Sequence, residues 1–109
     1  MITASFHTEG KKLTGFQVEG HSGLASAGED ILCAAVTSAV RLTECAINDV
    51  LGLEAGVKMK PEKALISLKL PGGLSQTNDS FCQNLLTGLM LYLSQLQEEY
   101  PENSIVMEV

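Results

Sequence analysis

Hydrophobic and polar residues alternate over much of the first twenty positions. Apolar side chains recur at every second position over residues 2–8, and a second apolar set falls within residues 12–19. A period of two is typical of a strand that buries one of its faces. Because a Glu9-Gly10-Lys11 turn signal separates the two segments, the pattern predicts a β-hairpin.

Two longer segments place apolar residues at helical spacing. The first extends from residue 31 to about residue 51, where Gly52 can end it, and the second covers residues 77–99, just before Pro101. Polar residues at 77–79 (Thr77, Asn78 or Asp79) can cap the second helix. The expected apolar face consists of Leu32, Val36, Ala39, Val40, Ile47 and Val50 in the first helix, and of Phe81, Leu85, Leu86, Leu89, Leu93 and Leu96 in the second.

The remaining apolar segments are short. Residues 57–60 and 66–70 alternate on either side of a Pro61-Glu62 turn and predict a second hairpin, and residues 105–109 predict a last strand. The expected order is ββαββαβ, an α+β fold in two layers, with two helices packed on one face of a mixed sheet. A chain of 109 residues accommodates this as a single domain, residues 1–109.

The charge balance bears on possible partners. Seven basic residues face 13 acidic ones, giving a net charge of -6, and aromatic residues make up only 5% of the chain. Such a chain repels phosphate backbones and offers few rings for base stacking. We therefore expect no direct nucleic-acid partner and consider a basic protein partner more compatible.

Cysteine usage and the absence of a leader bear on location. Three cysteines form no CxxC pair, and the two histidines complete no zinc pattern with them, so we expect no metal and no disulfide scaffold. The N-terminus lacks the basic and apolar regions of a signal peptide, and no apolar run approaches the roughly 20 residues that span a bilayer. These features predict a cytoplasmic protein without membrane association.

The candidate chemistry lies where the first hairpin meets the first helix. His21 follows the second strand, residues 20–28 include three glycines, and Cys33 lies near the helix start. If Asp30 is the N-cap, Cys33 is the third helical residue, where unpaired N–H groups and the helix dipole favour a thiolate. Those N–H groups could also form an oxyanion hole. The other possible cap is Ser26, with Glu29 completing a capping box, which would place Cys33 in the second turn.

The helical wheel places Cys33 on the seam between the apolar and the polar side of its helix. A cysteine there can present its sulfur at the edge of the sheet. It can equally be an inert, packed residue, because cysteine is among the residue types most often buried. Asp30 can orient His21, cap the helix or do both, and the glycines of the loop can act as hinges or only form turns.

One stretch resembles a known family signature. The signature of the bacterial ribosomal-processing cysteine protease family, Prp, is G-H-A-G followed by G-x-D-I-V-C-A-A-V-S. The corresponding residues here are Gly20-His21-Ser22-Gly23 and Gly28-Glu29-Asp30-Ile31-Leu32-Cys33-Ala34-Ala35-Val36. The chain departs from the family pattern at Ser22, at Leu24, where tyrosine is usual, and at Thr37, which replaces a serine.

This resemblance implies a homodimeric, cofactor-free cysteine endopeptidase of the cytoplasm, active in ribosome biogenesis. It would remove the short N-terminal extension of a large-subunit ribosomal protein precursor by cutting after an aromatic residue. The family's nucleophile falls on Cys33 and its general base on His21, while Gly20, Asp30 and Thr37 would support them. The mobile loop would consist of Ser22, Gly23, Leu24, Ala25, Ser26, Ala27 and Gly28.

An alternative function uses the same surface without catalysis. A noncatalytic ribosome-assembly protein could bind a basic ribosomal peptide, attracted in part by the acidic residues near position 100. The other candidate residues fit structural roles. We expect His7 at the surface or at a sheet edge, and Cys45 and Cys82 as structural residues, of which Cys45 could be partly exposed.

Overall fold

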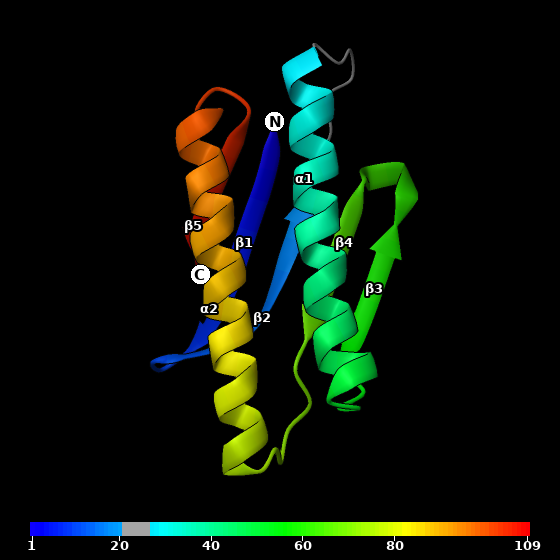
Figure 1. Ribbon diagram of the computed structural model, residues 1–109, viewed down its shortest axis with the longest axis vertical. Coiled ribbons are helices and arrows are strands. Elements are labelled where there is room, and N and C mark those ends of the chain that lie inside the picture. The colour runs from blue at the N-terminus through cyan, green and yellow to red at the C-terminus, as the bar shows by residue number, and fades with distance from the viewer. Residues whose placement is uncertain (21–26) are drawn as a thin grey trace.

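The computed structural model describes residues 1–20 and 27–109, and for residues 27–30 the backbone alone. Its order of elements confirms the ββαββαβ prediction (Figure 1). The elements are β1 (Ile2–Glu9), β2 (Lys12–Glu19), α1 (Ala27–Glu44) with its π-helical continuation η1 (Cys45–Val50), β3 (Gly56–Lys60), the 3-10 turn η2 (Pro61–Lys63), β4 (Leu65–Lys69), α2 (Gln76–Glu99) and β5 (Ser104–Glu108).

The strands form one mixed sheet in the order β3-β4-β2-β1-β5. The pairs β1–β2, β2–β4 and β3–β4 are antiparallel, whereas β5 lies parallel to β1. Both helices cover the same face of this sheet (Figure 1). The structure therefore confirms the two-layer α+β architecture.

The core lies between the helices and the sheet. Phe6 and Phe16 pair across β1 and β2 with ring centroids 5.9 Å apart, and Leu32 and Leu86 meet the sheet from the two helices without exposed surface. Burial of such apolar side chains is the main favourable term in folding. The fully buried side chains of the core are Phe6, Phe16, Leu32, Ile47, Leu86, Leu93, Val40 and Cys82.

Two residues expected in the apolar helix faces lie outside the core. Val50 is 76% exposed, since it ends η1, where π-helical winding rotates the face away from a regular helical spacing. Phe81 is 52% exposed because the buried stripe of α2 passes through its neighbour Cys82. The cap of α2 is Ser75, whose hydroxyl accepts a hydrogen bond from the Asn78 N–H at 3.2 Å, and not one of the residues at 77–79.

The start of α1 also differs from the expected one. The helix begins at Ala27, so Asp30 lies within its first turns and is not its N-cap. This start agrees with the alternative that Ser26 precedes the helix, although Ser26 itself lies outside the described residues. Ala27 and Gly28, expected in the mobile loop, belong to the helix.

By length and composition alone, the segment Ile31–Val50, with a mean hydropathy of 1.3, could also cross a membrane, whereas the sequence pattern predicted no such segment. The same segment places Leu32, Val36 and Val40 in the core against the sheet. Core helices of globular proteins have this composition too, so burial of these side chains in the core accounts for the apolar character of the helix.

Candidate active site

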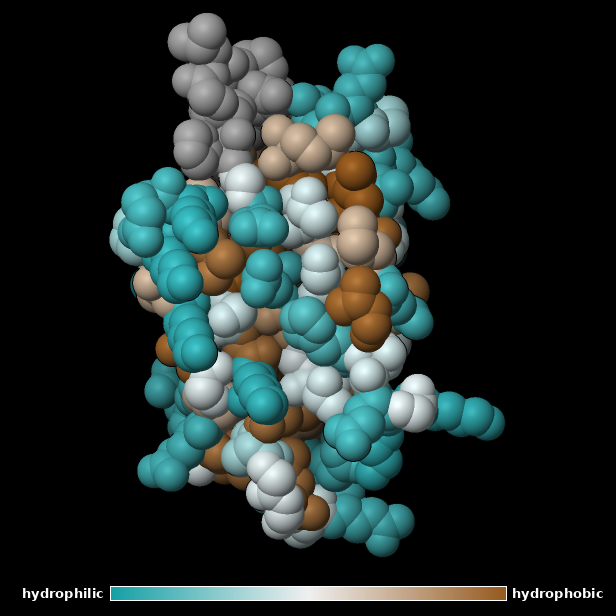
Figure 2. Space-filling model, turned by 180° about the vertical axis from the view of Figure 1, so that it is seen from behind, coloured by the Kyte–Doolittle hydropathy of each residue, from teal (hydrophilic) through white to brown (hydrophobic). Residues whose placement is uncertain are grey.

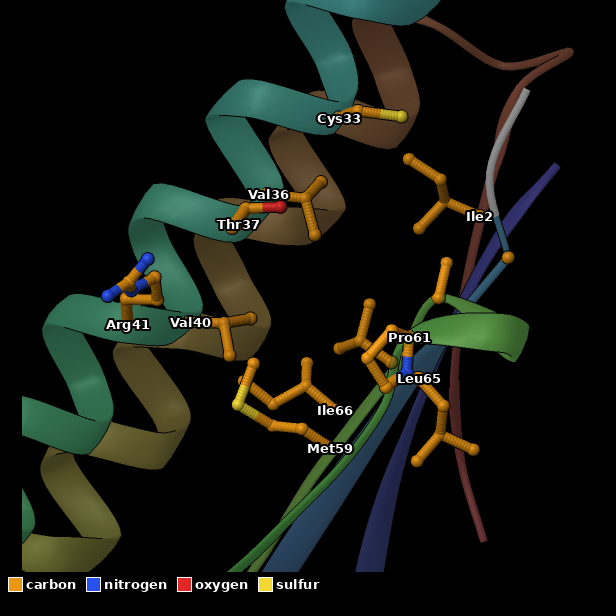
Figure 3. A pocket seen from close by; sticks show the side chains of 13 residues that line it. Ile2, Cys33, Val36, Thr37, Val40, Arg41, Met59, Pro61, Leu65 and Ile66 are labelled. Carbon is orange, nitrogen blue, oxygen red and sulfur yellow. The ribbon is translucent and has the colours of Figure 1, made fainter. Parts of the chain in front are cut away.

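An apolar pocket of about 280 Å³ opens between α1 and the β3–β4 hairpin, beside the first two strands (Figure 3). Cys33 lines it from the helix, with Met59, Pro61 and Ile66 across from it on the hairpin. Ile2 adds to the lining from β1. Since most of the lining is aliphatic, the pocket suits an apolar group.

Three residues of α1 line this pocket at intervals of four positions: Cys33, Thr37 and Arg41. Residues four apart lie above one another on a helix, so these side chains follow one wall of the pocket. Figure 3 shows the Cys33 sulfur directed away from the helix axis, toward the side where Ile2 lies. Cys33 is partly exposed, as its place on the seam predicted.

The position of Cys33 within the helix revises the expected electrostatics. Because α1 begins at Ala27, Cys33 is its seventh residue and lies about 9 Å along the axis from the helix start. The dipole effect falls off within the first turn, and the unpaired N–H groups belong to the first four residues. A cap at Asp30 would have placed Cys33 in the first turn, whereas the observed start places it beyond the four residues whose N–H groups are unpaired.

Gly20 connects the end of β2 to this pocket. Its φ of +101° lies in the region that favours glycine, and a Cβ there would overlap the carbonyl oxygen of Met1. Gly20 lines the same pocket as Cys33. The sequence-predicted His21 follows it in the chain and lies outside the described residues, as do Ser22, Gly23, Leu24, Ala25 and Ser26.

The supporting residues are placed only in part. Thr37 is exposed one turn beyond Cys33, and within residues 1–20 and 31–109 its hydroxyl has no described hydrogen-bond partner. The side chain of Asp30 lies outside the described residues. Thr37 therefore shares the pocket wall with Cys33, whereas the role of Asp30 stays a prediction.

The two other cysteines have different surroundings. Cys82 has no exposed surface, and its burial, with a smaller contribution from the charge of Asp79, raises the pKa of its thiol. Cys45 is exposed. Its pKa is raised by a hydrogen bond to Asp49, then by desolvation and by the charges of Asp49 and Glu44. A raised pKa disfavours the thiolate, so neither cysteine is prepared as a nucleophile.

Sequence reasoning missed the opposite wall and the far end of the pocket. Arg41 could have been found from its spacing to Cys33, because positions i and i+8 share a helix face. Met59 and Pro61 could not, because their place depends on how the β3–β4 hairpin meets α1. Among the described residues, no three His, Cys, Asp or Glu side chains are grouped to hold a metal ion.

Comparisons with known proteins extend over the whole chain. A family model described as cysteine protease Prp matches residues 1–105. The ribosomal processing cysteine protease Prp of Bacillus subtilis is 25% identical over 104 residues, which cover 94% of this chain and 93% of that protein.

Solved structures share the fold. Prp from S. aureus in complex with a substrate peptide is 21% identical, with a TM-score of 0.85 and complete coverage of both chains. A protein from Streptococcus mutans is 24% identical, with a TM-score of 0.87, over all of this chain and 94% of its own. These similarities place the described elements in a known architecture.

Proposed function

The chain belongs to the cysteine protease Prp family, and from that premise we propose that it removes a short N-terminal extension from a large-subunit ribosomal protein precursor. Membership makes the protein a cysteine endopeptidase and favours hydrolysis over the alternative of a noncatalytic assembly protein. The naming of the Bacillus subtilis relative as a ribosomal processing protease and the substrate peptide bound to the S. aureus relative support such a peptide substrate.

In the proposed reaction, Cys33 is the nucleophile and His21 the general base. His21 accepts the thiol proton, and the sulfur attacks the scissile carbonyl to form a tetrahedral intermediate. As the C–N bond breaks, His21 returns the proton to the leaving amine and an acyl-enzyme remains. Water then attacks the thioester, which releases the N-terminal peptide with a new carboxyl group and restores the thiol.

The observation that carries this proposal is the position of Cys33 at an apolar pocket. A nucleophile must be reachable by the substrate, and Cys33 is partly exposed at a pocket lined by Val36, Val40 and Ile66. The volume, about 280 Å³, is at the small end of ligand pockets. It therefore suits one large apolar side chain, such as the aromatic residue that would precede the cleaved bond.

We propose that His21 supplies most of the activation of Cys33, which lies in the second turn of α1. The helix dipole acts mainly on the first turn, so the base has to supply what the helix start does not. Replacement of His21 by alanine should therefore reduce cleavage nearly as much as replacement of Cys33. If His21→Ala retained most of the activity, another group would be the base.

The direct test is cleavage of a precursor that carries its N-terminal extension. Cys33→Ser and Cys33→Ala should abolish the cleavage, and Cys45→Ser, a matched change of an exposed cysteine on the same helical segment, should leave it intact. Replacement of the aromatic residue before the cut by alanine should lower kcat/KM, because the pocket then stays unfilled. Full-rate cleavage by either Cys33 variant would refute the assignment.

We further propose that the enzyme acts in the cytoplasm as a homodimer. The three cysteines are all free thiols, as in a reducing compartment. The outward side of the first helix exposes Ile31 and Leu42, and the second helix exposes Leu91 and Tyr92, which gives apolar surface for a second copy. Sedimentation of the purified protein as a monomer at working concentration would contradict the dimer.

A further inference from the structure

The face of the sheet that the helices leave uncovered carries a second groove, of about 480 Å³. Figure 2 shows this face, with hydrophilic side chains gathered toward the β3–β4 side and hydrophobic ones toward the side of β5. The groove crosses β1, β2, β4 and β3. Its lining includes His7, Gln17, Lys58, Ser67 and Lys69.

The strand register explains why donors gather there. Gln17 pairs with Ser67, and Ser67 pairs with Lys58, so the three side chains form one row across the strands. Their neighbours Phe16 and Leu68 face the core, and alternation along a strand directs this row to the open face. An amide, a hydroxyl and an ammonium group are thus presented side by side.

A second row alternates two large side chains with two glycines. His7 pairs with Gly15, Gly15 with Lys69, and Lys69 with Gly56. A Cβ at Gly56 would meet nothing nearer than the Lys69 carbonyl oxygen at 4.0 Å, so the space above it is open. The groove is therefore open beside Lys69, toward the β3 edge of the sheet, whereas a Cβ at Gly15, between His7 and Lys69, would overlap the Leu68 carbonyl oxygen.

The charge of the groove is opposite to that of the whole protein. The chain has 13 acidic residues and a net charge of -6, yet no carboxylate lines this groove. Four of the seven basic residues lie on the β3–β4 hairpin: Lys58, Lys60, Lys63 and Lys69. Within the described part of the chain, neither Lys58 nor Lys69 forms an ion pair. Their charges are available to an external anion.

We propose that this groove binds phosphate groups, with an RNA backbone or a free phosphate as the source. Lysine ammonium groups bind phosphate as point charges, and the hydroxyl of Ser67 and the amide of Gln17 can donate to the remaining oxygens. No exposed Phe, Tyr or Trp ring lines the groove, so base stacking would be limited to the His7 imidazole. Recognition would therefore depend on the backbone and not on sequence.

The groove and the Cys33 pocket lie on opposite faces of the sheet, so both can be occupied at once. The net charge of -6 opposes such binding at long range. Salt screens that repulsion over roughly 10 Å, whereas contacts within the groove act at shorter range. The proposal does not depend on the identity of the peptide substrate.

Binding of a fluorescein-labelled short RNA duplex, measured by anisotropy over a salt series, tests the proposal. The double variant Lys58→Gln/Lys69→Gln should weaken binding at least about tenfold and reduce the salt slope by about 2, because each lost phosphate contact contributes about 1. Gly56→Val should weaken it by filling the open space beside Lys69. Lys11→Gln, which removes a lysine outside the groove, should change neither quantity.

Parallel titrations identify the source of the phosphate. If inorganic phosphate binds and is lost in the double variant while the duplex does not bind, a free phosphate is the ligand. If neither probe binds, if both bind equally well to the double variant, or if poly-glutamate binds as tightly as RNA, the proposal is wrong. All variants should cleave the precursor at the wild-type rate, which separates this test from that of the proposed function.

Discussion

The two helices carry cysteines at matching positions with different surroundings. Cys33 is the seventh residue of α1 and Cys82 the seventh residue of α2. Cys33 is partly exposed at a pocket, whereas Cys82 has no exposed surface. Position relative to a helix start therefore does not distinguish a candidate nucleophile from a core residue here. What distinguishes them is whether the helix is closely packed on the sheet around the thiol.

The contacts of the second helix show how that side is closed. The Gln83 side chain accepts a hydrogen bond from the Leu13 N–H at 2.8 Å and donates one to the Leu13 carbonyl at 2.7 Å. Lys12 in the same strand forms an ion pair with Asp79. Beside Cys33, by contrast, α1 and the β3–β4 hairpin diverge and leave the pocket. The candidate site lies where packing is incomplete.

The largest expected effect is a loss of activity on replacement of Cys33, whereas replacement of Cys82 should reduce stability. Cys33→Ser should lower kcat/KM at least about 1,000-fold, as loss of a nucleophile does, with a change in unfolding free energy within about 0.5 kcal/mol. Cys82→Ser should reduce that free energy by about 1–3 kcal/mol, because it buries a hydroxyl in an apolar core, and should retain activity. Peptide hydrolysis and urea unfolding measure the two quantities.

The opposite results would contradict the distinction between Cys33 and Cys82. A Cys33→Ser variant that lost stability and not activity would make Cys33 a packing residue. A Cys82→Ser variant that lost activity while folded would place the second helix in the chemistry.

The next largest expected effect is a loss of stability when the hydrogen bonds of Gln83 are removed. Gln83→Ala should lower the unfolding free energy by about 2–4 kcal/mol, because it leaves the N–H and the carbonyl of Leu13 without partners in a partly buried site. Asn84→Ala, at the exposed neighbouring position, should change it by no more than about 0.5 kcal/mol. Equal losses in the two variants would show that the contact does not hold α2 to the sheet.

The fold was predictable because periodicity reports burial. The alternation that places Phe6 and Phe16 on one face of their strands, and the spacing that buries Leu86 and Leu93, follow directly from strand and helix geometry. The order of the strands in the sheet is harder to predict from the sequence. The parallel pairing of β5 with β1 depends on the crossover through α2, which local patterns do not encode.

Of the residues that line the pocket, the sequence pointed to Cys33 near a helix start and, through the family resemblance, to Gly20 and Thr37. Helix boundaries are set by competing local hydrogen bonds, so Asp30 and Ser26 both satisfied the capping pattern, and the helix begins at the earlier position. The wall formed by Met59 and Pro61 joins elements distant in sequence, so only the packed structure places it opposite Cys33. The same holds for the basic groove, whose rows depend on strand register.

The N-cap of α2 gives a smaller effect and tests that boundary argument. Ser75→Ala should lower the unfolding free energy by about 1 kcal/mol, because the Asn78 N–H loses its acceptor. Thr77→Ala, at one of the cap positions expected from sequence, should have little effect. Urea unfolding measures both. A larger loss of unfolding free energy for Thr77→Ala than for Ser75→Ala would show that Thr77, and not Ser75, caps the helix.

The smallest expected effect concerns Cys45 and changes the reactivity of one thiol without changing activity or stability. The hydrogen bond with Asp49, its charge and that of Glu44 raise the pKa of Cys45 above the ordinary 9.0. Asp49→Ala removes the first of these causes and lowers that pKa, so the thiolate fraction at pH 8 rises and labelling by iodoacetamide becomes faster.

The control is Glu62→Ala, which removes a distant exposed carboxylate and should leave the labelling rate of Cys45 unchanged. Peptide mapping by mass spectrometry follows each cysteine separately, and an unchanged Cys45 rate in Asp49→Ala would show that exposure alone governs this thiol. In the wild type, Cys45 should be labelled more slowly than Cys33 although it is the more exposed of the two, because only Cys33 would have a general base.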